Sequence, residues 1–466
     1  MTTLDAGPTR ALSIDDLRGA VTGAVIAPGD AEYDKARTVT NGAIDRRPAV
    51  IVRVADVDDV KTVIRLARET GLELAIRSGG HSAAGHSVTD GGIVLDLSAM
   101  KAIDIDVAGR TVWAETGNTA LDVTKAVGEH GLVIGFGDTG SVGIGGITLG
   151  GGVGYLVRKF GLTIDDLLAA EIVTADGELR TVDATTGPDL FWAIRGGGGN
   201  FGVVTRFKFR LHELASIVGG MLLLPATPET VEGFIAAATA ADDELSTIAN
   251  VMPCPPMPFV PEEHHGKLAI MAIVAYAGDT EAGERAIAPL RALATPIADM
   301  VQAIPYSGIY PPEDPDYHPL AAAKTMFMDF VDRDVADLIV ERLTASDASM
   351  RVVQLRVLGG AMARVPDDST AFAHRQSKIM VNVAAFYEGE DDRKVREAWV
   401  DHLAADLLQD DRGVYVNFVA DEGAARIRAA YPGATWDRLA AIKGRYDPSN
   451  LFRLNQNIPP ATADAT

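Results

Sequence analysis

The chain has 466 residues, more than one hydrophobic core usually serves, so we expect two domains. Its 42 basic and 64 acidic residues give a formal charge of -22, which disfavours contact with nucleic acid phosphates or anionic lipid. Hydrophobic residues make up 47%, yet no stretch approaches the roughly 18 consecutive apolar residues of a membrane helix. We therefore expect neither a nucleic-acid-binding protein nor a membrane protein.

Cysteine and histidine usage narrows the chemistry further. Cys254 is the only cysteine, which excludes an intramolecular disulfide and a thiolate cluster for zinc or iron–sulfur. His264 and His265 are adjacent and lack further ligands at useful spacing, so we expect no metal site. Because the first 21 residues contain no basic segment followed by an apolar one, we predict a cytoplasmic protein.

The first half of the chain predicts an α+β domain. A strand at 49–54, a helix from 57 closed by Gly71 and a strand at 72–78 form a βαβ unit, and His81 and His86 follow in a glycine-rich loop. Glycine fills half of residues 135–154, a composition that predicts loop and excludes helix. A strand, a "DG" turn and a strand follow at 166–184. Residues 188–212 predict a short helix, a second glycine-rich loop and a strand.

Beyond residue 212 the pattern changes to long strands with less glycine. "IVGGMLLLP", "KLAIMAIVAYAGD", "RVVQLRVLGGAMARV" and "KIMVNVAAFYEG" predict strands of one sheet. A helix begins after Thr227 with Pro228 at its first position. Residues 304–319 are rich in proline and tyrosine and predict a long functional loop, and 446–460 form a polar tail. A second domain therefore begins near residue 213.

The two glycine-rich loops do not fit a dinucleotide-binding fingerprint. The loop at 135–154 follows a helix instead of the first strand, and the P-loop pattern is absent. What remains is a set of backbone N–H groups from two loops, which suits a diphosphate.

Four motifs in order resemble one family. "RSGGHS", "GGITLGGGVGYLVRKFGLTIDDLLAAEIVTADG", "LFWAIRGGGGNFGVVT" and "YDPSNLFRLNQNIP" are similar to the berberine bridge enzyme-like FAD-linked oxidases of the vanillyl-alcohol oxidase superfamily. The resemblance covers about the first 212 and the last fifty residues. It implies a two-domain α+β fold of the PCMH type, with an FAD-binding domain from residues 1–212 plus 411–466. A substrate-binding domain at 213–410 would hold a central antiparallel sheet backed by helices.

The resemblance also implies which residues hold FAD. His81 matches the histidine that is joined covalently to the flavin, and imidazole is a neutral nucleophile at physiological pH. Thr139 stands where many members have a second, cysteinyl link, which indicates a single link and the bacterial monocovalent branch. That branch includes enzymes similar to 6-hydroxynicotine oxidase and polyketide-tailoring flavoenzymes. His86 has no such role and is expected to be a hydrogen-bonded loop residue.

Further cofactor positions follow from the same match. The residues implied around the diphosphate are Arg77, Ser78, Gly79, Gly80, Ser82 and Gly85, and those implied close to the cofactor are Gly145, Gly146, Gly150, Gly151, Gly152 and Gly154. Asn200, Gly202 and Val204 would lie near adenine and ribose, and Asn455 and Asn457 near the isoalloxazine. The alternative for each asparagine is loop scaffolding. Val142 matches a position where a small residue accompanies reaction with oxygen, although it could equally be ordinary packing.

The resemblance implies an FAD-dependent oxidase that transfers a hydride from a small hydrophobic or aromatic alcohol, phenol or amine and reduces molecular oxygen to hydrogen peroxide. A base must accept the substrate proton. The candidates are Tyr415 and Glu388 first, then Tyr155 and Gln354, and also Arg356, Asn382, Tyr387 and Asn417. Lone tyrosines are more often core or rim residues, and Tyr306 and Tyr310 could line an aromatic pocket or a packed turn.

Two alternative functions stay open. A dehydrogenase would pass electrons to a quinone or a protein, and a flavin-retaining binding protein would show no turnover. The residues indicate neither the natural substrate nor the oligomeric state.

Overall fold

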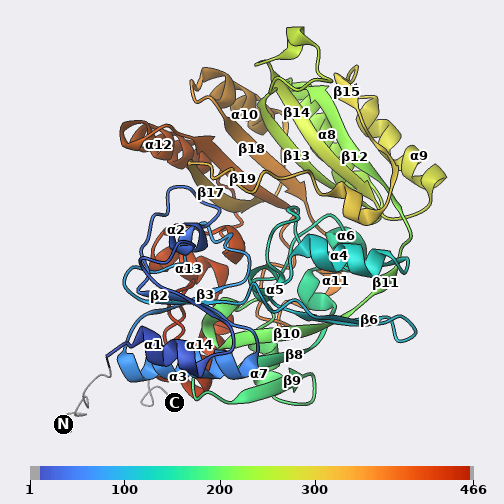
Figure 1. The fold of residues 1–466 in the computed structure, drawn as a ribbon. Helices are drawn as coiled ribbons and strands as arrows, with labels where there is room; N and C mark the ends of the chain where they lie inside the picture. Colours follow the sequence, from blue (N-terminus) through green and yellow to red (C-terminus); the bar gives the residue numbers. More distant parts are fainter. Residues whose placement is uncertain (1–10, 462–466) are drawn as a thin grey trace.

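The computed structural model describes residues 11–461, which form two regions (Figure 1). Segments from both chain ends lie together in the lower region of the view, and the middle of the chain forms a large sheet with helices above them. The α+β architecture expected from the sequence is confirmed. Within residues 11–461 we find no helix that is both long enough and apolar enough to cross a membrane.

A small, mostly parallel sheet supports the first predicted unit. Strands β2 (Val50–Arg53), β4 (Ile93–Asp96) and β3 (Leu74–Arg77) run parallel, and β1 (Ala24–Ile26) pairs antiparallel to β2. Helix α3 (Val57–Thr70) connects β2 to β3; the Asp56 side chain caps its start, and Gly71 ends it at φ 70°. The predicted βαβ unit is confirmed, with β4 inserted between its two strands.

An antiparallel sheet lies beside the parallel one. Its order is β5-β6-β10-β8-β9, and β7 and β11 form a separate pair. The strands are β5 (Ile103–Asp106), β6 (Thr111–Glu115), β7 (Leu132–Val133), β8 (Leu167–Val173), β9 (Leu179–Asp183), β10 (Val203–Arg210) and β11 (His212–Glu213). The predicted hairpin of β8 and β9 is confirmed. The helices of this half are α1 (Ile14–Ala20), α2 (Tyr33–Arg37), α4 (Ala120–Gly128), α6 (Val157–Phe160) and α7 (Pro188–Ala193).

The prediction that residues 135–154 contain no helix is wrong. Helix α5 (Ile144–Leu149) forms inside this segment. Ile144, Thr148 and Leu149 are buried, so tertiary packing outweighs the low helix propensity of the glycines. A Cβ on Gly145 would lie 2.9 Å from the Ser78 Cβ, so glycine here lets α5 pack directly against the loop that carries His81.

The middle of the chain forms an eight-stranded antiparallel sheet in the order β15-β12-β14-β13-β18-β19-β17, with β16 also paired to β12. The strands are β12 (Ile217–Pro225), β13 (Leu245–Pro253), β14 (Leu268–Tyr276), β15 (Ala298–Asp299), β16 (Gln302–Ile304), β17 (Ala321–Met328), β18 (Arg351–Val357) and β19 (Ile379–Phe386). One face packs its alternate apolar side chains against helices α8 (Pro228–Ala240), α9 (Thr280–Arg291), α10 (Arg333–Ala345) and α12 (Glu390–Asp406). The other face is turned toward the region formed by the two chain ends (Figure 1).

The predicted strand across residues 351–365 is too long. Strand β18 ends at Val357, and Gly359 and Gly360 follow with φ of 100° and 60°. This left-handed backbone breaks the strand, and the short helix α11 (Ala361–Arg364) comes next.

The chain then returns to the core of the first region. Helices α13 (Ala424–Ala430) and α14 (Ala434–Tyr446) place Tyr431, Leu439 and Ile442 in the same buried cluster as the antiparallel sheet β5–β10. Residues 447–461 form no helix or strand, as predicted for a polar tail.

Candidate functional site

A cavity of ≈ 840 Å³ opens at the carboxyl ends of the parallel strands. Residues from six separate segments line it, among them Lys35, Thr38, Arg53, Arg77, Ser78, Gly79, Gly80, His81, Asp96, Ser141, Glu313 and His318. Five of the predicted cofactor residues, from Arg77 to His81, therefore lie on one wall. Ser82 and Gly85 lie outside the lining; they form a turn in which the Ser82 hydroxyl accepts the His86 N–H at 3.2 Å.

Charged side chains end all three parallel strands at this cavity. Arg53, Arg77 and Asp96 are the last residues of β2, β3 and β4. Arg77 Nη2 lies 2.9 Å and Arg53 Nε 3.3 Å from Asp96 Oδ2. Burial works against ionisation, but Arg77 holds the pKa of Asp96 below its usual value. With Lys35 also in the wall, the cavity offers cations to a diphosphate.

The loop that carries His81 makes backbone contact with the start of α5. A Cβ on Gly79 would lie 2.2 Å from the Gly143 nitrogen, so only glycine permits this approach. Ser78 Oγ accepts the Gly145 N–H at 3.2 Å and donates to the Thr116 carbonyl at 2.5 Å. The end of α5 is held as well, because Asn417 Nδ2 donates to the Ile147 carbonyl at 3.1 Å. Helix α5 is thus held by the His81 loop at its start and by Asn417 at its end.

The glycines predicted near the cofactor fall into two groups. Gly80 has no neighbour closer than 3.7 Å to an added Cβ, and Gly146 has none within 4 Å among the described residues. The others approach protein groups instead. Added Cβ atoms would meet Asn417 at Gly150, Phe372 at Gly151, Thr163 at Gly152, the Phe136 carbonyl at Gly154 and the Val173 carbonyl at Gly202. Gly80 and Gly146 are therefore the positions where a ligand can come close to the backbone.

His81 is held by a serine. Its Nε2 lies 3.0 Å from Ser141 Oγ. Burial lowers the pKa of His81, although Glu313 and Asp138 oppose this, so the imidazole is neutral at physiological pH. Thr139 bonds to Asp138, with 3.3 Å between Thr139 Oγ1 and Asp138 Oδ1. Val142 is partly buried against the core of this region, and its carbonyl accepts the Ala120 N–H at 2.9 Å.

The imidazole of His86 forms no hydrogen bond in the part of the chain that the structure describes, although the sequence predicted a hydrogen-bonded loop histidine. Both ring nitrogens are buried and have no hydrogen-bond partner within residues 11–461. Burial, and then the charge of Arg46, lowers the pKa of His86 to about 4.

This burial predicts acid sensitivity. In the unfolded chain His86 binds a proton below pH 6.5, whereas in the folded chain it does so only near pH 4. The contribution of neutral His86 to the free energy of unfolding is therefore fully present above pH 6.5 and decreases as the pH falls below that value. At about 1.4 kcal/mol per pH unit, His86 accounts for a loss of about 3 kcal/mol by pH 4. Urea unfolding at pH 7 and at pH 4.5 gives the free energy of unfolding at each pH. His86→Asn should reduce the difference between these two free energies, whereas His402→Asn, at an exposed site, should not. Equal acid sensitivity of His86→Asn and the wild type would contradict the assignment.

A polar row crosses the sheet face opposite the helices. Asn250, Gln354 and Asn382 are in register on β13, β18 and β19. Gln354 Nε2 donates to Asn250 Oδ1 at 2.8 Å, and Arg356 Nε donates to Gln354 Oε1 at 2.9 Å. Arg356 also forms an ion pair with Asp138. Asp138 was not predicted; it stands in the first glycine-rich loop and links that loop to the sheet.

Aromatic rings border this row. Tyr155 OH donates to the Asp138 carbonyl at 3.2 Å. The ring of Tyr310 meets those of Tyr155 and Tyr306 edge-on, at centroid distances of 6.2 and 6.0 Å. Burial raises the pKa of Tyr310 to about 12 and raises the pKa values of Tyr155 and Tyr306 as well. All three phenols are neutral and belong to the buried core of this region, so Tyr306 and Tyr310 pack within a turn.

Tyr415 is fully buried against the second half of the glycine segment. Its hydroxyl oxygen accepts hydrogen bonds from Gly152 N at 3.0 Å, Val153 N at 3.3 Å and Asn417 Nδ2 at 2.9 Å. Burial raises the pKa of Tyr415, while these donors oppose the increase. Glu388, by contrast, is exposed; its backbone N–H donates to Asp392 at the start of α12. The structure therefore places Tyr415, but not Glu388, beside the predicted cofactor loops.

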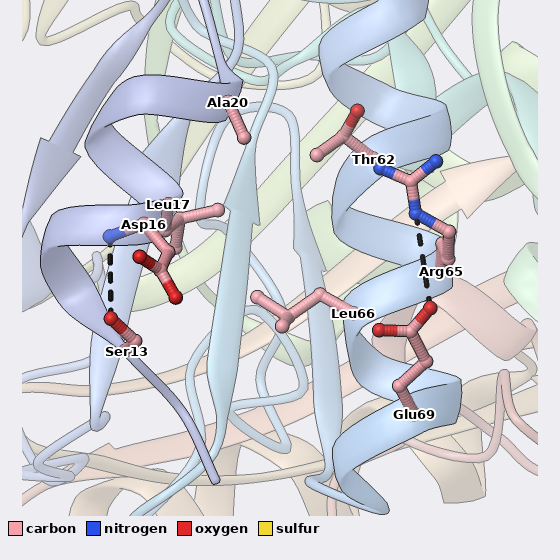
Figure 2. Close-up of a pocket in the computed structure, with 8 residues that line it drawn as sticks. All are labelled: Ser13, Asp16, Leu17, Ala20, Thr62, Arg65, Leu66 and Glu69. Atoms are coloured by element: carbon pink, nitrogen blue, oxygen red, sulfur yellow. Dashed lines mark hydrogen bonds and ion pairs between the residues drawn. The ribbon is translucent and has the colours of Figure 1, made fainter. Parts of the chain in front are cut away.

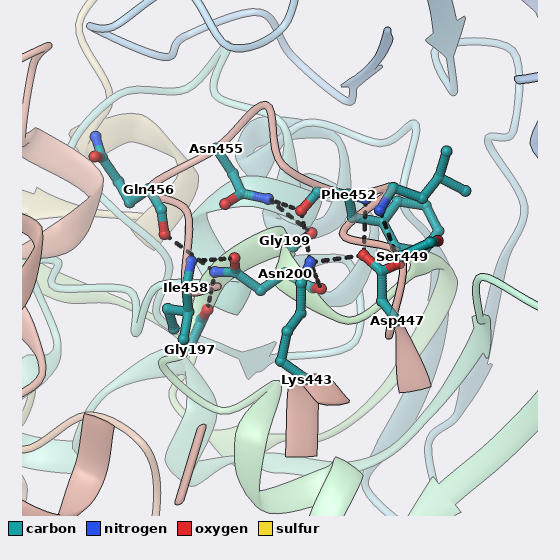
Figure 3. A network of polar contacts seen from close by, with 11 residues as sticks. Gly197, Gly199, Asn200, Lys443, Asp447, Ser449, Phe452, Asn455, Gln456 and Ile458 are labelled. Carbon is teal, nitrogen blue, oxygen red and sulfur yellow. Dashed lines mark hydrogen bonds and ion pairs between the residues drawn. The ribbon is translucent and has the colours of Figure 1, made fainter. Parts of the chain in front are cut away.

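Two of the predicted asparagines, Asn200 and Asn455, lie around a buried lysine (Figure 3). Lys443 Nζ donates to Asp447 Oδ2 at 2.7 Å and to the carbonyls of Asn200 at 2.7 Å and Phe452 at 2.9 Å. Asn200 Oδ1 accepts the Ile458 N–H at 2.9 Å, which ties the second glycine-rich loop to the tail. Val204, on β10, is buried and its carbonyl accepts the Thr116 hydroxyl at 2.7 Å.

Two amide oxygens of the tail are left for a ligand. The Oδ1 atoms of Asn455 and Asn457 are buried and have no hydrogen-bond partner within residues 11–461. Buried polar atoms are normally paired, so these acceptors fit a ligand that carries N–H or O–H groups.

Two further observations delimit the site. A small hollow of ≈ 50 Å³ between α1 and α3, lined by Leu17 and Leu66 among others, contains none of the predicted residues (Figure 2). In the part of the chain that the structure describes, no group of three His, Cys, Asp or Glu side chains could hold a metal ion.

Comparison with known proteins agrees with this geometry. Residues 48–183 match the FAD binding domain model, and residues 414–459 match the "berberine and berberine like" model. An FAD-linked oxidoreductase from Dictyostelium discoideum is 30% identical over 96% of this chain and 97% of its own. The (R)-6-hydroxynicotine oxidase of Paenarthrobacter nicotinovorans is 30% identical over 94% and 97%.

Solved structures give the same result. The crystal structure of 6-hydroxy-D-nicotine oxidase from Arthrobacter nicotinovorans superposes with a TM-score of 0.84 at 29% identity, over 95% of this chain and 98% of that one. The expected two-domain fold of the PCMH type is confirmed. The chain belongs to the berberine bridge enzyme-like family of FAD-linked oxidoreductases.

Proposed function

We propose that the protein is an oxidase that holds FAD through a single covalent link at His81. It would take a hydride from a small hydrophobic or aromatic alcohol, phenol or amine and pass the electrons to oxygen, with hydrogen peroxide as product. The observation that carries this proposal is a neutral His81 imidazole on the wall of a cavity that also contains Lys35, Arg53 and Arg77. Thr139, which cannot form a cysteinyl link, supports the single attachment.

The residues present fit FAD. Lys35, Arg53 and Arg77 would balance the diphosphate charge, and the unpaired oxygens of Asn455 and Asn457 would accept the polar edge of the ring system. When bound, FAD supplies an acceptor for the hydride and a donor of electrons to oxygen. The phenol rings of Tyr155, Tyr306 and Tyr310 form a buried aromatic cluster next to the first glycine-rich loop, and this apolar surrounding supports a small hydrophobic substrate.

The substrate proton needs an acceptor. We propose Tyr415, because three N–H donors to its oxygen favour the charged form and so oppose the rise in pKa that burial causes. Gln354 is proposed to orient the substrate from the polar row. Its amide already bonds to Asn250 and Arg356, which fixes its position.

Anaerobic mixing with candidate substrates tests the function. An alcohol, phenol or amine of the proposed class should bleach the flavin absorbance, and air should restore it with one hydrogen peroxide per cycle. Bleaching followed by slow reoxidation in air would instead indicate a dehydrogenase. If no compound of these classes bleaches the flavin, the oxidase proposal fails in favour of a binding protein.

Val142 gives a separate prediction about oxygen. Val142→Ile adds a methylene at the position that the family match connects with oxygen access. We therefore expect the reduced flavin to be reoxidised about tenfold more slowly, which corresponds to an increase of about 1.4 kcal/mol in the activation free energy. Stopped-flow mixing of reduced enzyme with oxygen measures this rate. Val107→Ile, at an exposed site, is the control and should leave it unchanged. An unchanged rate in Val142→Ile would show that Val142 only packs.

A further inference from the structure

The long loop of the sheet domain reaches the residue proposed to carry FAD. Glu313, in the loop between β16 and β17, contacts Ser141 in the first glycine-rich loop. Ser141 N donates to Glu313 Oε1 at 3.0 Å, and Ser141 Oγ donates to Glu313 Oε2. The end of the same loop is also fixed, because the Gly42 N–H donates to the Pro319 carbonyl at 3.2 Å. Glu313, Ser141 and His81 line one cavity.

The direction of these hydrogen bonds sets the state of His81. A serine hydroxyl has one hydrogen, and Ser141 gives it to the Glu313 carboxylate. Toward His81, 3.0 Å away, Ser141 Oγ therefore acts as an acceptor, and the imidazole carries its hydrogen on Nε2. The lone pair then lies on Nδ1. A carboxylate that fixes an imidazole tautomer through a hydrogen bond is the arrangement that activates nucleophiles in catalytic triads.

We propose that Glu313 and Ser141 are positioning residues for the covalent attachment of FAD to His81. This inference rests on the proposed function, in particular on the link at His81. It assigns a role to the irregular segment 304–319 and to a residue from the other domain. Attachment would therefore require the assembled interface between the two domains.

Covalent attachment would form one bond and break two, with oxygen as the electron acceptor. His81 Nδ1 forms a bond to the 8α carbon, while one C–H bond of the 8α methyl group and the N–H bond at His81 Nε2 are broken. Two protons and two electrons are released overall, and molecular oxygen accepts them as hydrogen peroxide. The Nε2 proton leaves by way of Ser141 toward the Glu313 carboxylate. That carboxylate also stabilises the positive charge that develops on the ring as Nδ1 is alkylated.

The other charged group that faces His81 does not replace Glu313. Glu313 and Asp138 both favour the protonated imidazole, and burial opposes them. Asp138 is already paired with Arg356 and bonds to Thr139. Within residues 11–461, Glu313 is the carboxylate that reaches His81 through a hydroxyl, that of Ser141.

The test follows attachment in time. Flavin-free protein, prepared from riboflavin-starved cells, is mixed with saturating FAD in air; acid-stable flavin is measured against time, and total bound flavin before acid. Glu313→Gln and Ser141→Ala should bind FAD with unchanged affinity but attach it roughly 10²-fold more slowly, near the lower range of a positioned base. Glu313→Asp should recover part of the rate. Asp316→Asn, an equal charge change in the same loop, should attach at the wild-type rate.

Each outcome has one meaning. Attachment at the wild-type rate in Glu313→Gln overturns the inference and leaves the proposed function intact. Loss of FAD binding in Glu313→Gln also overturns it, because it assigns a structural role to Glu313. If the wild type itself attaches no flavin at His81, the proposed link fails, and this inference fails with it.

Discussion

Lys443→Met should lower the free energy of unfolding by about 3–5 kcal/mol, the usual cost of breaking a buried ion pair from one side. Both Lys443 and Asp447 have side chains that are 0% exposed, so the variant leaves the Asp447 carboxylate charged and without its cation. Backbone N–H groups of Leu451 and Phe452 still donate to that carboxylate at 2.8 Å, but they carry no full charge. The carbonyls of Asn200 and Phe452 also lose their shared donor.

Urea unfolding followed by circular dichroism measures the loss. Lys394→Met, on the exposed surface of α12, is the matched control and should stay within about 0.5 kcal/mol of the wild type. Because Lys443 fixes the tail that carries Asn455 and Asn457, FAD binding should weaken in Lys443→Met as well. A free energy of unfolding close to the wild type would contradict the account of this network.

Tyr415→Phe should affect both stability and chemistry. It leaves the backbone N–H groups of Gly152 and Val153 without their acceptor, at about 1–3 kcal/mol for each buried donor. If Tyr415 is the proton acceptor, flavin reduction by substrate should also slow by roughly 10²–10⁴-fold. Anaerobic stopped-flow reduction at saturating substrate separates this rate from substrate affinity.

Tyr431→Phe is the control for this variant. Tyr431 is equally buried, and its hydroxyl has no hydrogen-bond partner within residues 11–461, so removal of the oxygen should not destabilise the protein. A Tyr415→Phe protein that is destabilised but reduced at the wild-type rate would show that Tyr415 anchors the glycine loop and that the base lies elsewhere.

Local signals in the sequence predicted most of the secondary structure. Asp56 and Gly71 bound α3 because capping and left-handed glycine depend on neighbouring residues alone. Helix α5 was not predicted, because it depends on contacts with residues that are remote in sequence. Its glycines are unfavourable for an isolated helix, and tertiary contacts stabilise it: the packing of Ile144 and Leu149 and the hydrogen bonds with Ser78 and Asn417.

The site could be predicted only in part. The motif around His81 identified one wall of the cavity, and Arg53, Arg77 and Asp96 could have been found together because each ends a parallel strand, where ligands of such sheets bind. Glu313 and Asp138 could not have been identified in this way, because both lie in loops, and loop residues that are remote in sequence carry no periodic signal. Glu388 was chosen because the predicted strand at 378–389 included it, but β19 ends at Phe386 and Glu388 is exposed.

The link at His81 is the central claim, and one measurement on the purified wild type tests it. The protein is precipitated with acid, washed and digested, and the flavin-bearing peptide is identified by mass spectrometry. The account predicts that yellow colour stays with the protein and that the peptide containing His81 carries the mass of one flavin. Colour released to the supernatant, or flavin on a peptide that lacks His81, would contradict it.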